Sequence, residues 1–80
     1  MNALSLIQKN YSSMSPVEKR IADCILADPE AAINATVVYI SAKAEVSEGS
    51  VMNFASMLGF KGFSQMKINL AQNLSTYSVR

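Results

Sequence analysis

The chain of 80 residues contains no histidine and no tryptophan, only one cysteine and three glycines, and just 16% charged residues. Without histidine, and with Cys24 alone, the sequence has no cluster of metal ligands and no base to activate a nucleophile. We therefore predict no enzyme, no metal and no cofactor. Cys24 also has no partner for a disulfide within the chain, and its apolar helical surroundings favour a buried thiol.

Long apolar runs are missing too. No stretch approaches the roughly 20 residues that a membrane-spanning helix needs, and the N-terminus lacks the pattern of a secretory signal. We expect a cytoplasmic protein with no membrane partner. Half of the residues are hydrophobic, which is typical of one folded domain with a modest core.

Acidic residues are absent from the second part of the chain. All six carboxylates precede residue 51, together with four Lys and Arg residues, whereas residues 51–80 hold three cations and no acid. This asymmetry indicates a cationic end that can face phosphates. Because so few cations neutralise few phosphates, one copy would bind weakly, and we expect a homodimer or a higher homo-oligomer.

Helix signals recur along the whole sequence, and no segment alternates like a half-buried strand. Ser15 and Pro16 followed by Glu18 predict a helix start with a capping box. Asp28-Pro29 likewise predicts the end of that helix and the start of a short one. We predict an all-α fold, a compact bundle of about five helices. The helix after Ser15 is expected to bury Val17, Ile21, Cys24 and Ile25, and the last helix to run from Ser64 to about Leu74.

Two consecutive helices are joined through Glu45-Val46-Ser47. Thr36 is expected to cap the first helix and Ser47 the second, and Gly59 stands where a left-handed C-cap ends it. Two short helices with a turn of three or four residues fit a helix-turn-helix, from about Val37 to Leu58. By spacing alone, an ordinary helical hairpin fits equally well.

Three segments in fixed order carry a resemblance that separates these alternatives. They are Met14-Ser15-Pro16-Val17-Glu18-Lys19-Arg20-Ile21-Ala22-Asp23, Asp28-Pro29-Glu30, and the stretch from Ser47 to Phe54 with Leu58-Gly59-Phe60-Lys61-Gly62-Phe63 and Met66-Lys67. Together they resemble the N-terminal domain of RpiR-type bacterial transcription regulators, over most of the chain from about Met14 to Leu74.

The resemblance implies a non-enzymatic domain that binds double-stranded operator DNA as part of a dimer or tetramer. It places a helix-turn-helix DNA-binding domain over residues 1–74 and the beginning of a linker over residues 75–80. The linker would lead to a C-terminal sugar isomerase (SIS) domain, absent from this sequence, that senses a phosphorylated sugar. The implied function is transcription regulation of carbohydrate metabolism.

At two positions the chain departs from the family pattern. Glu45 stands in the turn where the family usually has glycine, and a left-handed conformation there would cost a non-glycine residue on the order of 1 kcal/mol. Asn53 stands where the family commonly has arginine before the Phe of the recognition helix. Asparagine suits adenine and carries no charge, so we expect a different operator or weaker binding.

The predicted DNA contacts follow from the helical period, because Val51, Phe54 and Leu58 face the core. Asn53 is the expected reader of a base edge, and Met52 an apolar contact for a thymine methyl. Glu48 is expected to cap the helix or lie at the rim, unless it accepts from a cytosine amino group. The full set of predicted DNA-binding residues is Ser47, Glu48, Gly49, Ser50, Met52, Asn53, Ser56, Lys43, Lys61 and Lys67.

Two other functions match parts of the sequence. Gly59-Phe60-Lys61-Gly62 spells the G-x-x-G of RNA-binding KH modules, but those also need a sheet that this sequence does not predict. A protein-interaction or dimerisation module that kept the fold and lost strong DNA binding is the stronger rival. Apolar residues at exposed positions would form its face, namely Leu6, Val38, Tyr39 and Ile68.

Overall fold

The computed structural model describes the backbone of residues 2–78 and the side chains of residues 2–74. Within this part the chain is helical and has no strand, as predicted. The elements in order are α1 (Ala3–Asn10), a 3-10 turn η1 (Tyr11–Ser13), α2 (Pro16–Ala27), α3 (Pro29–Ile33), α4 (Val37–Ala44), α5 (Glu48–Met57) and α6 (Phe63–Ser78).

The predicted helix starts are confirmed at atomic detail. The Ser15 hydroxyl accepts from the Glu18 amide at 3.2 Å, and the Glu18 carboxylate accepts from the Ser15 amide at 2.8 Å, which completes the capping box of α2. Asp28 caps α3 by accepting from the Ala31 amide, and Thr36 caps α4 by accepting from the Tyr39 amide. Because these signals act within four residues, they determine where each helix begins whatever surrounds it.

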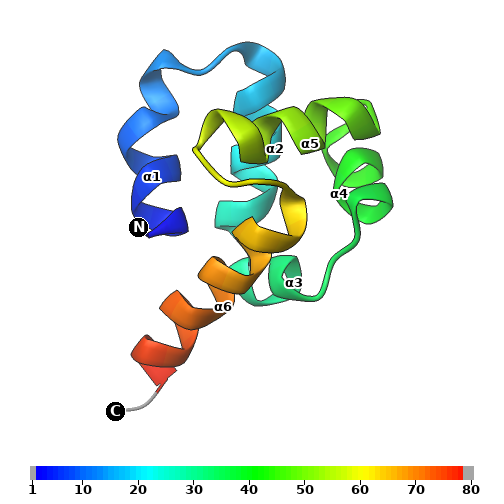
Figure 1. Cartoon of the computed structure of the whole chain (residues 1–80). Coiled ribbons are helices and arrows are strands. Elements are labelled where there is room, and N and C mark those ends of the chain that lie inside the picture. The colour runs from blue at the N-terminus through cyan, green and yellow to red at the C-terminus, as the bar shows by residue number, and fades with distance from the viewer. Residues whose placement is uncertain (1, 79–80) are drawn as a thin grey trace.

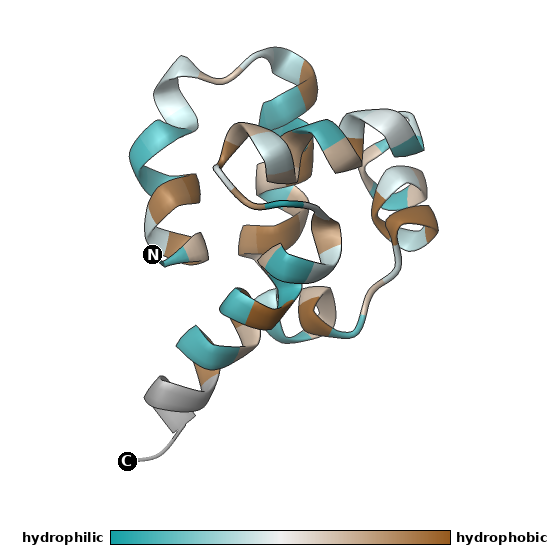
Figure 2. Ribbon diagram, in the orientation of Figure 1, coloured by the Kyte–Doolittle hydropathy of each residue, from teal (hydrophilic) through white to brown (hydrophobic). Residues whose placement is uncertain are grey.

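The core forms where α2 is enclosed by the other helices. Figure 1 shows α1 and α4 on opposite sides of α2, with α5 and α6 crossing between them. The most deeply buried aliphatic side chains come from five different helices. They are Ile7, Ile21, Ile25, Ile40, Val51 and Leu70. Figure 2 shows hydrophobic segments, in brown, on the helices around the middle of the domain. The helices therefore share one core.

Two side chains of α2 differ from the prediction. Val17 was expected in the core but is 41% exposed, because it lies in the first turn and the buried row starts one turn later at Ile21. Cys24 is half-buried, since it borders an open groove between α2 and α4. Ala22 takes a buried place that the sequence pattern had not assigned.

The last helix is longer than predicted. It continues through Ser78 instead of ending near Leu74, because residues 75–78 contain neither proline nor glycine and nothing breaks the helix. Its Asn69 accepts a hydrogen bond from the Ala3 amide at 2.7 Å, and Asn73 accepts from the Leu4 amide at 3.5 Å. The two ends of the domain are thereby joined. Among the described residues, no helix combines the length and the apolar character needed to cross a membrane.

Candidate nucleic-acid interface

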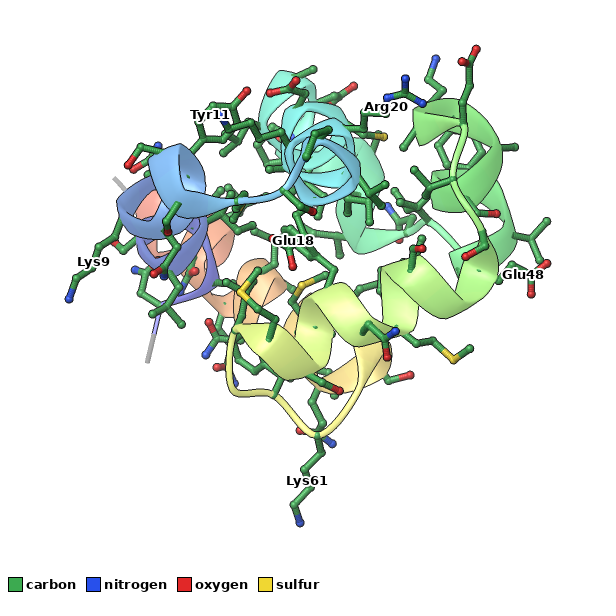
Figure 3. All side chains as sticks on the ribbon, turned by 90° about the horizontal axis from the view of Figure 1, so that it is seen from above. Lys9, Tyr11, Glu18, Arg20, Glu48 and Lys61 are labelled. Carbon is green, nitrogen blue, oxygen red and sulfur yellow. The ribbon has the colours of Figure 1, made fainter. Side chains whose placement is uncertain are left out.

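The turn between α4 and α5 has the left-handed residue that the sequence places there. Glu45 adopts φ 60° and ψ 48°, and the next amide, that of Val46, donates to the Ser41 carbonyl at 2.9 Å. The guanidinium of Arg20 on α2 donates to the Glu45 carbonyl at 3.4 Å, near the upper edge of α4 in Figure 3. The turn keeps its helix-turn-helix shape although it lacks the usual glycine.

The first turn of α5 is organised by two serines. Ser47 accepts from the Ser50 amide at 3.1 Å, and the two hydroxyl oxygens lie 2.9 Å apart. Glu48 is exposed and points away from the body of the molecule in Figure 3. At Gly49 an added Cβ would meet only the Ser47 hydroxyl, at 3.9 Å, so internal packing does not require glycine here.

Helix α5 has one buried and one exposed face. Val51, Phe54 and Ala55 are buried, whereas Met52 is 50% exposed and Asn53 and Ser56 are exposed as well. The two faces are divided as the 3.6-residue period predicts. The exposed face of α5 is therefore polar apart from two thioethers, those of Met52 and the 42% exposed Met57, and it is free to approach another molecule.

A hollow of about 490 Å³ adjoins this face. It brings together three of the predicted residues, Met52, Ser56 and Lys61, with Val37 at the start of α4. The first turn of α6 closes the hollow through Ser64 and Gln65, which the sequence analysis missed. The polar pair Ser64-Gln65, one residue after the Lys61-Gly62 connector, was the available signal. Thus α4, α5 and α6 present one continuous surface.

The three predicted lysines have different surroundings. Lys61 is exposed and extends into solvent beside the hollow, as Figure 3 shows. Lys67 is half-buried; its ammonium donates to the Ala35 carbonyl at 2.6 Å and lies 5.2 Å from the Phe63 ring centre. Lys43 lines a separate groove of about 650 Å³ between α2, α3 and α4. Only Lys61 therefore borders the hollow on the α5 face.

Neither a metal-binding cluster nor an activated thiol is found among the described residues. They contain no group of three or more His, Cys, Asp or Glu side chains able to hold a metal. Burial raises the pKa of the Cys24 thiol above its ordinary value, although nearby Lys43 acts in the opposite direction. A thiol of this kind is a poor nucleophile at neutral pH.

The capped helix α4, the left-handed turn and the half-exposed helix α5 define a helix-turn-helix domain, which is a non-enzymatic fold. A family model described as the helix-turn-helix domain of the rpiR family matches residues 1–77. The chain belongs to this family, as its resemblance to RpiR-type regulators predicts.

Relatives and a solved structure agree with this assignment. An uncharacterised HTH-type transcriptional regulator of Thermotoga maritima is 41% identical over 76 residues, covering 94% of this chain and 27% of that protein. The HTH-type transcriptional regulator HexR of Escherichia coli is 36% identical over 75 residues, covering 94% of this chain and 26% of HexR. The chain spans about a quarter of the length of these relatives.

The crystal structure of the N-terminal domain of the regulator YbbH from Bacillus subtilis is similar throughout. It superposes with a TM-score of 0.91 at 37% identity, covering 98% of this chain and 95% of that one. The fold of this chain is therefore that of the N-terminal domain of an HTH-type regulator.

Proposed function

We propose that this chain binds operator DNA by inserting the outward face of α5 into the major groove. The observation that carries the proposal is the exposed face of Met52, Asn53 and Ser56, which adjoins a hollow bordered by Lys61. Second helices of helix-turn-helix domains dock in this way, while flanking groups hold the phosphates.

The proposed contacts divide by chemistry. Side chains on the outward face of α5 reach base edges, and groups around it position the phosphate backbone. The base-facing set consists of Asn53, Met52, Ser56 and Gly49. The phosphates are held by Ser47, Ser50 and Lys61. The rim of the interface consists of Glu48, Lys43 and Lys67. Lys67 is placed there because it already donates to Ala35, and Lys43 because it lines the other groove.

Two copies are needed for a full operator. Helix α5 has ten residues and is about 15 Å long, which spans only four or five base pairs at about 3.4 Å each. We therefore propose a homodimer or higher homo-oligomer on a palindromic site. Its half-sites would lie about one helical turn apart.

In the cell, we propose a cytoplasmic transcription regulator of carbohydrate metabolism. The resemblance supports this role, and the relatives named above extend far beyond the matched part. Residues 1–74 form the DNA-binding domain in this proposal, and residues 75–80 lead toward an SIS domain that senses a phosphorylated sugar. The backbone is helical through Ser78, so that connection would begin as a helix.

A mobility-shift titration tests DNA binding directly. The chain, alone and as a tandem of two linked copies, is titrated with the DNA upstream of its own gene at low and at physiological salt. We expect weak binding by the single copy and binding about 10²–10⁴-fold tighter by the tandem, since linkage makes the second contact intramolecular. Failure of both to bind any duplex at low salt would refute the proposal.

The exposed side chains of α4 favour one rival, a protein-interaction module. Val38 is 59% and Tyr39 47% exposed, and Ile68 on α6 is 53% exposed. Leu6, by contrast, is half-buried against the core on α1, and Figure 1 shows α1 and α4 on opposite sides of the domain. The four residues therefore do not form one face. The rival would be supported if the chain binds no DNA but associates with itself, and if Val38→Ser abolishes this self-association.

A further inference from the structure

Helix α5 has an unusual charge distribution for a helix that enters DNA. Its ten residues, from Glu48 to Met57, include one ionisable side chain, the carboxylate of Glu48, and no Lys or Arg. Recognition of guanine commonly uses two donors from one Arg or Lys to its O6 and N7 atoms. A carboxylate has no proton to donate at neutral pH. Helix α5 therefore lacks the usual side chains for reading guanine.

Two of the side chains that α5 exposes match the edges of A·T pairs. Asn53 offers an amide with both a donor and an acceptor, the combination that adenine presents at N7 and its N6 amino group. Met52, 50% exposed and next in the sequence, offers a flexible apolar thioether. The C5 methyl of thymine is the apolar group on the major-groove edge of the bases.

The neighbours of Asn53 leave room for the close approach that a short side chain requires. Gly49 lies four residues before it and Ser56 three residues after it, so both share its side of the helix. A Cβ at Gly49 would meet only the Ser47 hydroxyl, at 3.9 Å, so the space above that turn is open. Ser56 is short as well, and Met57, four residues after Asn53 and 42% exposed, has a long but flexible side chain that can turn aside.

We infer that α5 reads two neighbouring A·T pairs in each half-site, with Asn53 bonded to adenine and Met52 packed on a thymine methyl. This inference rests on the proposed DNA-binding function and goes beyond it by naming the bases. Ser56 and Lys61 border the same hollow and position the helix without selecting these two pairs.

Selection from a library of randomised DNA duplexes tests the base preference first. The chain is used as it is, at low salt, and retained duplexes are sequenced. We expect two neighbouring A·T pairs in every enriched half-site. The base pairs read by Asn53 and Met52 are those whose selectivity is lost in Asn53→Ala and Met52→Ala. If G·C pairs are enriched at these positions, the inference is overturned, whereas the proposed DNA binding still stands. Retention of no duplex overturns the proposed function together with the inference.

Base analogues in a selected duplex then test each contact separately. Uracil in place of thymine removes only the methyl group, and 7-deazaadenine removes only the N7 acceptor. Uracil should weaken binding by the parent chain but not by Met52→Ala, and 7-deazaadenine should weaken the parent but not Asn53→Ala. Loss of the whole amide contact in Asn53→Ala should lower affinity about 5- to 150-fold.

Matched variants complete the test. Met57→Ala removes a methionine that is 42% exposed on the same helix, outside the residues that line the hollow. It should keep the full response to uracil. Asn34→Ala removes an exposed amide at the end of α3 and should keep the response to 7-deazaadenine. Circular dichroism verifies that each variant folds. The inference would be overturned if uracil weakened binding by the parent and by Met52→Ala equally, or if 7-deazaadenine weakened binding by the parent and by Asn53→Ala equally.

Discussion

Among the cations of the described residues, Lys61 is the one that lines the hollow beside α5. It is exposed beside the hollow at α5, whereas Lys67 is already bonded to the Ala35 carbonyl. Since each phosphate neutralised by a cation releases a counterion, one lysine in contact with DNA contributes a defined increment to the salt dependence. The surroundings of a lysine, rather than its mere presence, decide whether it can act on DNA.

We predict that Lys61→Ala weakens binding to all DNA sequences alike and reduces the slope of log affinity against log salt by about one unit. Salt titrations of the parent and the variant provide the measurement. Lys9→Ala is the matched control, because Lys9 is exposed on α1 and points away from Lys61 in Figure 3. An unchanged slope in Lys61→Ala would remove this residue from the interface.

The left-handed residue Glu45 predicts a stability change. At φ 60° its Cβ is crowded against the backbone, and glycine relieves this at some cost in the entropy of the unfolded chain. Glu45→Gly should raise the free energy of unfolding by up to about 1 kcal/mol in urea denaturation. Glu45→Ala loses the carboxylate but keeps the Cβ, so it should show no such gain. Equal gains in both variants would point to charge instead.

At the scale of elements, α5 combines a weak helix former with an exposed face. Gly49 lies in its first turn, and nothing in the domain fills the space of the missing Cβ. Glycine is less favourable in a helix than alanine by up to about 1 kcal/mol. The fold therefore gives no reason for glycine here, whereas the proposed approach of DNA would give one.

Gly49→Ala should separate stability from binding. We expect a free energy of unfolding higher by a few tenths to about 1 kcal/mol, because alanine is the better helix former. DNA affinity should fall, because the new methyl group stands between the helix and the base edges. Thermal or urea unfolding and a mobility-shift titration on the same sample measure the two effects. A variant that is more stable and binds DNA equally well would disprove close approach at this position.

The contact between η1 and α2 predicts a pH response. The Tyr11 hydroxyl donates to the Asp23 carboxylate at 2.8 Å. This hydrogen bond, with desolvation and repulsion by the carboxylate, raises the pKa of Tyr11 above its ordinary value of 10.0. Its contribution to stability is therefore fully present below about pH 10 and is lost as the pH rises through the folded-state pKa.

Asp23→Asn should lower the pKa of Tyr11 toward the ordinary value. Titration of phenolate absorbance follows this change, and the difference from Tyr11→Phe isolates the Tyr11 signal from the other tyrosines. Coinciding titration curves for Asp23→Asn and the parent would show that the hydrogen bond does not persist in solution.

The elements also show which features a sequence can predict. The starts of α2, α3, α4 and α5 were predictable because each cap acts on an amide within three residues. The end of α6 was not, since the tail has no local stop signal and the helix simply continues. The exposure of Val17 depends on which other helices reach the first turn of α2, and sequence periodicity has no information about that.

For the molecule as a whole, long-range contacts set the limit of prediction. The exposed face of α5 followed from its period, but the hollow beside it requires α6 to start next to Met52 and Ser56. The bond from Lys67 to Ala35 joins residues 32 positions apart, so the sequence alone suggested a DNA contact for that lysine. Helical period and caps thus predict the elements, whereas the surface that the elements share emerges from their packing.

The bond between the Ala3 amide and Asn69 has a consequence for how the domain is made. Translation produces α1 before α6, so the partner of the Ala3 amide is added 66 residues later. Until α6 leaves the ribosome, Ala3 and Ile7, both fully buried in the finished fold, lack part of their covering. Helix α1 therefore completes its packing only after α6 has been made, and until then chaperones have access to its apolar face.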